Sequence, residues 1–576
     1  MGDLAAVRGG RTVAVVGGGI AGLAAAWELT GGATGPGGGS PRVVVLEASR
    51  RLGGKVATAE VAGVPVDVGP DGFLGRRPEA AALCREVGLA DRLAPIGATG
   101  AAVWARGRRR PLPDGLFLGV PTRWWPVARS GILSLGGTAR LLTDVVAPRP
   151  DRRGPLGDRA IGPLVSRKLG HQVVQRLVDP LLGGIYAGSV ADASAAAVLP
   201  VLLTVSQRRA SFMRGLRRAA AQQAAAPGPP PPPGPPEPPG PAEPPGPAEP
   251  SGPDGVGAPD TGSTGVQPAP AFWTLDGGLG TLTQRLCAAL ARRGVRLETG
   301  TAVTGMTRAE GGGWVLTTPG GPLAADAVVL ALPAPAAAGL LAPHDTEIAA
   351  LLRTVEYASI AVVTLSFPDA AFGEMLQGTG LLVPQGTPLP RPAAALLAGH
   401  AGPEGKAGGG TCMVTACTYL WAKWPHLARP GERLLRASVG RFGDDRFAAV
   451  DDEDLVTRVT AELDAMIGVS GPPSGALVTR WPDALPQYRV HHLMRVAGVE
   501  AAVTRLGRLA VAGAAYRGVG LPACVASGRH AAREVLDQLE PASPTGPARP
   551  PEARRASPGA AEPPPAGTGG PALAPP

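Results

Sequence analysis

Glycines spaced as Gly17-x-Gly19-x-x-Gly22 can bring a polypeptide backbone close to phosphate groups. The first glycine permits a tight turn, the second lets the main chain approach a pyrophosphate, and the third lets a helix pack closely on a strand. Further along the chain, the carboxylate of Glu47 can accept hydrogen bonds from both hydroxyls of a ribose. The loop is completed by Gly18, Ile20 and Ala21. This spacing predicts a dinucleotide-binding site.

Such a loop works only if flanking elements hold it. Thr12–Val16 is a short apolar run typical of a buried parallel strand, and residues 23–29 are rich in alanine and predict a helix. A second apolar run, Arg42–Leu46, ends at Glu47. The resulting βαβ unit would aim a helix N-terminus, with its free N–H groups and positive dipole end, at the phosphates.

A second glycine pair, Gly53-Gly54, follows the ribose carboxylate almost at once, flanked by Arg51 and Lys55. We expect this segment to wrap the far side of the pyrophosphate, which a site for exchangeable NAD does not need. The run Glu47-Ala48-x-x-Arg51-Leu52-Gly53-Gly54 resembles the flavoprotein superfamily that includes amine oxidases, phytoene desaturases and protoporphyrinogen oxidases. That resemblance implies tightly bound FAD.

Later segments resemble the porphyrinogen oxidase branch, so that the likeness spans the globular part of the chain. His491 departs from the pattern, because members commonly carry glycine there. The matching runs are Val66-Asp67-Val68-Gly69-Pro70-Asp71-Gly72-Phe73-Leu74, Thr274-Leu275-x-Gly277-Gly278-Leu279, Arg480-Trp481-Pro482-x-Ala484-Leu485-Pro486-Gln487-Tyr488 and Gly518-Val519-Gly520-Leu521-Pro522-x-Cys524-Val525-x-Ser527-Gly528.

The resemblance also implies where FAD would bind. The loop of residues 17–22 would hold the pyrophosphate and Glu47 the adenosine ribose, while Val303, in a strand, would meet the adenine through its backbone. Val303 as an ordinary strand residue and Trp481 as ordinary core stay open. The other implied cofactor contacts are Ala48, Arg51, Gly54 and Lys55 beside the ribose and pyrophosphate, Gly69, Pro70, Asp71 and Gly72 along the isoalloxazine, and Trp481, Val519, Gly520 and Leu521 near the flavin ring and ribityl chain.

The activity implied by the resemblance is oxygen-dependent oxidation of coproporphyrinogen III to coproporphyrin III in haem biosynthesis. Three two-electron rounds would each take hydride from a methylene bridge and release hydrogen peroxide. Propionate groups need cationic partners, and Arg76 and Arg77 are the candidates. No residue can be assigned as the proton acceptor. Ferrochelatase is an expected recipient of the product.

Four alternatives stay open: a protoporphyrinogen IX oxidase, a flavin amine oxidase, a carotenoid-type desaturase, and a scaffold whose proline-rich insertion recruits partner domains. With 22 Phe, Trp and Tyr residues, the chain is poorly supplied for the aromatic cage of an amine oxidase. Arginines just past the flavin-lining segment and four propionates on the substrate favour coproporphyrinogen.

The predicted fold class is α/β, with a Rossmann-like FAD-binding domain, a mixed-sheet substrate domain and an inserted helical lobe. The run from residue 78 to about 213 reads as mostly helical. The expected divisions are residues 9–85, 272–335 and 500–540 for the FAD domain, 86–221 for the lobe over the substrate cleft, 222–270 for a disordered proline-rich insertion, 336–499 for the substrate domain and 541–576 for a disordered tail.

Composition excludes several classes. The 84 glycines and 65 prolines among 576 residues crowd partly into two segments, leaving a globular remainder. Five scattered cysteines predict neither disulfides nor a metal site, and the net charge of +9 comes without a nucleic-acid-binding motif. We expect no transmembrane helix and a cytoplasmic location, with peripheral contact at the inner face of the membrane left open by Trp124 and Trp125.

Overall fold

A five-stranded parallel sheet forms the centre of one half of the computed structural model, which describes residues 10–32, 39–146, 157–207, 210–225, 270–398 and 410–540. Most of its central strand residues are apolar, as expected for a sheet covered on both faces. The order is β12 (Arg296–Glu298), β2 (Arg42–Leu46), β1 (Thr12–Val16), β16 (Ala327–Leu330) and β22 (Leu509–Val511).

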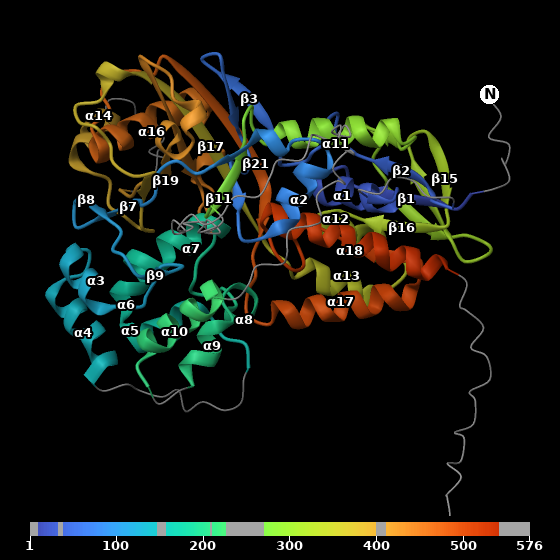
Figure 1. The fold of residues 1–576 in the computed structure, drawn as a ribbon, viewed down its shortest axis with the longest axis horizontal. Coiled ribbons are helices and arrows are strands. Elements are labelled where there is room, and N and C mark those ends of the chain that lie inside the picture. Colours follow the sequence, from blue (N-terminus) through green and yellow to red (C-terminus); the bar gives the residue numbers. More distant parts are fainter. Residues whose placement is uncertain are drawn as a thin grey trace, which may run out of the picture. The chain divides into compact units, whose positions relative to one another are not determined.

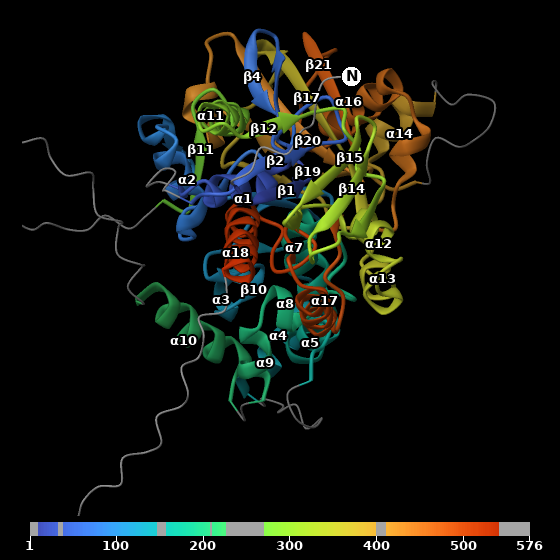
Figure 2. The same cartoon turned by 90° about the vertical axis from the view of Figure 1, so that its right-hand side faces the viewer.

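One face of this sheet packs against α1 (Ile20–Leu29), α2 (Pro78–Glu86), α11 (Gly280–Arg292) and α18 (Leu521–Leu539). Helices α1 and α18 lie side by side (Figures 1 and 2), so close that a Cβ on Gly528 would come within 2.0 Å of the Ala21 carbonyl oxygen. The other face packs against β13 (Gly305–Arg308), β14 (Trp314–Thr318), β15 (Gly321–Ala325), α12 (Ala334–Leu341), α13 (Thr346–Arg353) and α17 (His492–Leu506).

A seven-stranded sheet forms a second core with α16 (Asp452–Ile467). It is mixed, because β18 and β7 pair in parallel while the other neighbours are antiparallel. The order is β21 (Gly475–Pro486), β17 (Tyr357–Pro368), β20 (Glu432–Val439), β19 (Val414–Tyr419), β18 (Gly380–Leu382), β7 (Ala102–Ala105) and β8 (Arg108–Pro111).

A lobe of helices (Figure 1, lower left) has its own apolar core. Asp144 fixes its last helix by accepting hydrogen bonds from Ser211 Oγ and from the N–H groups of Phe212 and Met213. Its helices are α3 (Trp124–Ser130), α4 (Leu135–Val146), α5 (Ile161–Leu169), α6 (His171–Val173), the π-helical η3 (Val174–Val178), α7 (Asp179–Tyr186), α8 (Ala195–Val198), α9 (Val201–Ser206) and α10 (Phe212–Ala225).

Short elements complete the described chain. The strands are β3 (Thr58–Val61) paired with β4 (Val64–Asp67), β11 (Phe272–Leu275) between β5 (Phe73–Leu74) and β6 (Leu93–Pro95), and β9 (Leu116–Phe117) paired with β10 (Val120–Pro121). The helices are η2 (Ala90–Arg92), η4 (Asp369–Ala371), α14 (Arg391–Ala398), α15 (Leu420–Lys423), η5 (Pro425–Leu427) and η6 (Arg446–Ala449).

The predicted α/β class and the first two strands are confirmed. The reading of residues 78–213 as mostly helical is wrong between β6 and β10, where short strands join the region to the seven-stranded sheet. The domain boundaries stay a prediction, because the residues up to Leu539 form one compact unit. Helix α10 runs to Ala225, inside the segment predicted as the insertion. The rest of that segment up to residue 269, and the predicted tail, lie outside the described residues.

Candidate functional site

The first glycine loop joins β1 to α1 and tolerates no side chain at two of its three glycines. A Cβ on Gly17, whose φ is +104°, would lie 2.4 Å from the Ala331 carbonyl oxygen. A Cβ on Gly22 would lie 1.9 Å from the Gly17 carbonyl oxygen. Both distances are far inside van der Waals contact, so the turn and the helix–strand packing require glycine.

Gly19 differs, because a Cβ there would meet no protein atom within 4 Å. The loop is therefore open on the side where the backbone can approach a ligand. Helix α1 begins directly after Gly19, without a side-chain cap and with no acidic residue in its first turn. Its N-terminal N–H groups and positive dipole end can serve an anion, so the residues present fit the pyrophosphate of a dinucleotide. Ile20 and Ala21 form the start of the helix and are buried.

Glu47, at the end of β2, is held against this loop. Its Oε2 accepts a hydrogen bond of 2.7 Å from the Gly18 N–H, and its Oε1 accepts one of 2.9 Å from the Ser49 N–H. Each carboxylate oxygen has two lone pairs, so capacity for two ribose hydroxyls remains. Ala48, next to it, is exposed.

The second glycine pair lies beside the first loop. The Gly53 N–H donates to the Gly18 carbonyl at 2.8 Å, and a Cβ on Gly54 would lie 3.1 Å from Gly19 Cα. Arg51 does not reach outward: its guanidinium donates to the carbonyls of Leu52, Gly54 and Val56 and so fixes the loop itself.

Lys55 follows and is exposed, although the surrounding protein desolvates its ammonium group and lowers its pKa. The charges of Cys524 and Asp483 oppose that shift.

Close packing and a hydrogen bond fix the backbone of residues 69–72, the segment predicted to line the isoalloxazine. A Cβ on Gly69 would lie 1.8 Å from the Lys55 carbonyl oxygen, and one on Gly72 would lie 2.7 Å from the Trp424 ring. Trp481 donates from its indole Nε1 to the Val68 carbonyl at 2.7 Å. Trp481 is therefore more than ordinary core, because it positions the backbone that leads into this segment.

Charges hold Asp71 within that segment. Lys423 Nζ lies 2.8 Å from Asp71 Oδ2, and Arg436 Nη1 lies 4.0 Å from it while Nη2 donates to the Gly69 carbonyl. Burial alone would raise the pKa of Asp71, but the two cations outweigh it and keep the pKa below the usual range. Pro70 completes the segment.

The pKa of Asp67, at the end of β4, is shifted in the opposite direction. Its carboxylate accepts hydrogen bonds from Thr58 Oγ1 at 2.7 Å and from the Leu279 N–H at 2.8 Å. Burial raises the pKa of Asp67 to about 7, against these two hydrogen bonds.

Val303 is a correction to the predicted site, because it lies in a loop and not in a strand: β13 begins only at Gly305. Two backbone hydrogen bonds hold the start of this loop against the segment that follows β2. The Gly300 N–H donates to the Ser49 carbonyl and the Thr301 N–H donates to the Glu47 carbonyl, both at 2.8 Å. The loop therefore starts beside the ribose carboxylate even though the element type was wrong.

Val519, Gly520 and Leu521 lead into α18, and Leu521 is its first residue. Tyr488 anchors this turn. Its hydroxyl donates to the Ala514 carbonyl at 2.6 Å and accepts from the Gly518 N–H at 2.7 Å. The ring of Tyr488 stacks on buried His492 at 3.9 Å between centroids, and burial lowers the pKa of His492 to about 4.

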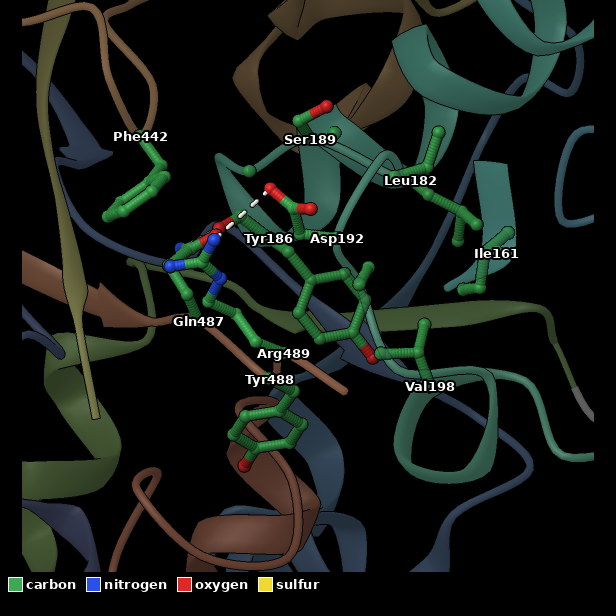
Figure 3. Close-up of a pocket in the computed structure, with 14 residues that line it drawn as sticks. Ile161, Leu182, Tyr186, Ser189, Asp192, Val198, Phe442, Gln487, Tyr488 and Arg489 are labelled. Carbon is green, nitrogen blue, oxygen red and sulfur yellow. Dashed lines mark hydrogen bonds and ion pairs between the residues drawn. The ribbon is translucent and has the colours of Figure 1, made fainter. Parts of the chain in front are cut away.

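Tyr488 also lines a cavity that is partly open to solvent (Figure 3). Its lining is largely apolar and aromatic, and comes from the helical lobe, from the end of β21 and from the turn after β20. Arg441 and Asp179, a buried ion pair at 3.1 Å, hold the lobe to that turn. The lining residues are Ile161, Leu182, Gly183, Tyr186, Gly188, Ser189, Val190, Asp192, Ala193, Val198, Phe442, Gln487, Tyr488 and Arg489.

Sequence reasoning missed this cavity. Gln487 and Tyr488 were noticed only as part of a family motif, and Tyr186, Asp192 and Arg489 were not singled out. Arg76 and Arg77 are exposed, are not among the lining residues, and Arg77 is paired with Glu79 at 2.7 Å. Nothing in the local sequence marks the missed residues, because each wall comes from a different part of the chain.

In the described part of the chain, no group of three His, Cys, Asp or Glu side chains is arranged to hold a metal ion, and no helix is long and apolar enough to cross a membrane.

Comparison with known proteins agrees with this geometry. Residues 20–536 match the family described as flavin containing amine oxidoreductase. The chain is 30% identical to coproporphyrinogen III oxidase of Bacillus subtilis, covering 92% of this chain and 99% of that protein. It is 38% identical to the protein of the same name from Propionibacterium freudenreichii, covering 93% and 92%.

A crystal structure from Exiguobacterium sp. 255-15, assigned as a protoporphyrinogen oxidase, superposes with a TM-score of 0.72 at 28% identity over 92% of this chain and 99% of that one. Cyclohexylamine oxidase from Brevibacterium oxydans, 15% identical with a TM-score of 0.58 over 92% and 100%, shares the fold. The predicted family resemblance, oxidoreductase class and FAD cofactor are confirmed. The chain belongs to the flavin-containing amine oxidoreductase family.

Proposed function

We propose that this protein is an oxygen-dependent FAD oxidase that converts coproporphyrinogen III to coproporphyrin III in haem biosynthesis. The observation that carries the proposal is Tyr488, which lines the cavity while its hydroxyl holds the turn before α18. One residue thus connects a mostly apolar cavity to the predicted flavin site. Relatives named for this reaction support the substrate.

The chain's own residues bind and orient in this proposal. The two glycine loops and Glu47 hold the dinucleotide, and the pinned segment of residues 69–72 offers a backbone without bulky side chains to the flavin ring. The remaining proposed contacts are Ala48, Lys55, Val303, Trp481, Val519, Gly520 and Leu521. Arg51 acts by shaping the second loop.

When bound, the flavin supplies the electron chemistry, accepting an electron pair from the substrate and passing it to dioxygen. Each round removes two hydrogens from the macrocycle and yields one hydrogen peroxide. Three rounds remove six hydrogens, consume three dioxygen molecules and leave the aromatic porphyrin. The apolar walls, such as Ile161, Leu182 and Val198, exclude water from the macrocycle. Arg76 stays the proposed partner of a propionate at the outer edge, since Arg77 is engaged by Glu79.

The test is aerobic oxidation of coproporphyrinogen III and protoporphyrinogen IX by the purified flavin-loaded protein, side by side. Porphyrin fluorescence and peroxide are followed together. Faster turnover of the first substrate, with three peroxides per porphyrin, is the expected result. Preference for the second would establish the alternative, a protoporphyrinogen oxidase. Oxidation of amines but of neither porphyrinogen would overturn the proposal.

Peripheral contact with a membrane is part of the proposal, as is delivery of the product to a ferrochelatase there. Trp124, Trp125 and Leu135 on α3 and α4 expose 41%, 48% and 92% of their surface. Arg129 lies 5.8 Å from the Trp125 ring centroid. Exposed tryptophans beside arginine suit the interface of an anionic bilayer.

Co-sedimentation with vesicles containing phosphatidylglycerol tests this contact. The double variant Trp124→Ala/Trp125→Ala should lose most of the bound fraction. Met494→Ala, which alters an even more exposed apolar residue on α17, serves as the control and should bind as the wild type does. Equal binding by both variants would remove the membrane from the proposal.

A further inference from the structure

Two charged side chains face each other at the mouth of the cavity. Of the residues that line it, Arg489 is the cation and Asp192 the carboxylate, and the other lining residues are uncharged (Figure 3). An arginine at the rim of an apolar cavity is suited to a planar carboxylate that enters with an otherwise apolar ligand.

Arg489 has two acidic partners, one in close contact and one at a longer distance. Its Nη1 donates to Glu356 in a short hydrogen bond, whereas its Nη2 lies 3.3 Å from Asp192 Oδ2. Glu356 precedes β17 and does not line the cavity, so this pair orients the guanidinium from behind. The Asp192 side chain is 62% exposed and makes the longer contact on the cavity side. Asp192 is therefore the partner that a ligand can replace.

Hydrogen bonds fix the backbones of both residues. The Val490 N–H donates to the Asp192 carbonyl at 3.2 Å, and the Ser194 N–H donates to the Tyr488 carbonyl at 2.7 Å. Ala193 and Arg489 form an antiparallel bridge. Release of the Asp192 carboxylate thus requires only rotation of a side chain into solvent.

We infer that Asp192 occupies Arg489 until a carboxylate of the substrate displaces it, so that Arg489 is a specificity-determining residue at the cavity mouth. The inference rests on the proposed function, in which the carboxylate is a propionate of a tetrapyrrole. Exchange of one carboxylate for another costs little, because an exposed ion pair contributes little stability. A substrate with more propionates has more ways to make the contact.

Steady-state kinetics with coproporphyrinogen III tests the exchange. Asp192→Asn removes the competitor and should lower KM about 2- to 5-fold with kcat unchanged. Arg489→Gln should raise KM about 10-fold, and Arg489→Lys should recover part of that loss. Asp369→Asn, which breaks an exposed ion pair with Arg433 remote from the cavity lining, is the matched control and should leave KM as it is.

The double variant Asp192→Asn/Arg489→Gln isolates the interaction. If Asp192 acts through Arg489, the gain from Asp192→Asn disappears in the double variant. A gain that persists there, or a KM unchanged in Asp192→Asn, would overturn the inference.

Binding without turnover separates this inference from the proposed function. Fluorescence titration with coproporphyrin III and with its tetramethyl ester should show tighter binding to Asp192→Asn for the acid only. Equal shifts for acid and ester would overturn the role of charge. Wild-type protein that oxidises no porphyrinogen would instead refute the proposed function, whatever the variants bind.

Discussion

The paired glycine loops and the cavity recognise ligands by different means. The loops present backbone, and Gly17 and Gly22 are required because protein atoms fill the space that a Cβ would take there. The cavity presents side chains such as Tyr186, Phe442 and Arg489 from segments far apart in the chain. A site built from backbone leaves a motif in the sequence, whereas one built from side chains leaves almost none. The loops should therefore respond to changes in volume, and the cavity to changes in polar contacts and charge.

The largest expected effect is in the first loop. Gly22→Ala places a methyl group 1.9 Å from the Gly17 carbonyl oxygen, so we expect a loss of about 3 kcal/mol or more of stability together with loss of bound flavin. Thermal unfolding and the flavin absorbance of the purified protein measure both. Gly19→Ala is the matched control: its methyl group meets no protein atom, so it should weaken flavin binding while flavin-free protein unfolds at the wild-type temperature. Wild-type flavin affinity in Gly19→Ala would contradict a pyrophosphate at this loop.

Lowering the pH should change the stability contributed by the two regions in opposite directions. His492, beside the cavity, has a folded-state pKa of about 4 against 6.5 unfolded, so its stabilisation is present above pH 6.5 and is lost as pH falls toward 4. Asp67, beside the loops, has a pKa of about 7 against 3.8, so its stabilisation is present at low pH and is lost as pH rises through 7. At 1.36 kcal/mol per pKa unit, these shifts correspond to about 3 kcal/mol for His492 and about 4 kcal/mol for Asp67.

Thermal midpoints measured from pH 4.5 to 8 check these signs. His492→Phe, which keeps an aromatic ring, should flatten the loss of stability on acidification. Asp67→Asn should remove an opposing loss on the alkaline side. If both substitutions changed the pH dependence of the thermal midpoint in the same direction, the opposite signs assigned to His492 and Asp67 would be contradicted.

A smaller effect is expected where the two regions meet. Tyr488→Phe leaves the Ala514 carbonyl and the Gly518 N–H without their shared partner, at a cost of about 1 to 2 kcal/mol and with weaker flavin retention. Tyr516→Phe is the control, because its buried hydroxyl has no hydrogen-bond partner among the residues that the structure describes, so its removal should be neutral or stabilising. Equal behaviour of the two variants would show that the cavity wall and the flavin turn are independent.

The smallest effect concerns a single backbone angle. His491 adopts φ +70°, which is unfavourable for a residue with a side chain. We expect His491→Gly to raise the stability by about 1 kcal/mol. Gly468→Ala, at φ +71° with open space around it, should lower it by a similar amount. Thermal midpoints that move in the same direction would show that strain does not govern this turn.

Sequence patterns predicted the glycine loops and their flanking strands well, because glycine spacing and apolar runs specify β1, β2 and the loops directly. They failed where local pattern and tertiary structure differ. Val303, predicted to lie in a strand, lies in a loop before β13. The short strands β7 and β8 were missed because β8 pairs with β7, which in turn pairs with β18 far along the chain. The cavity could not be predicted from the sequence, because the segments that line it come together only after folding.

The contact between α1 and α18, where Gly528 packs on Ala21, has a consequence for synthesis on the ribosome. The helix that opens with the first glycine loop emerges early, yet the helix that covers it is among the last parts of the described chain to be made. Until then the apolar face of α1 lacks its partner, and closing so long a loop is slow. The nascent chain should therefore depend on chaperones until translation is nearly complete, and cofactor loading should be a late, post-translational event.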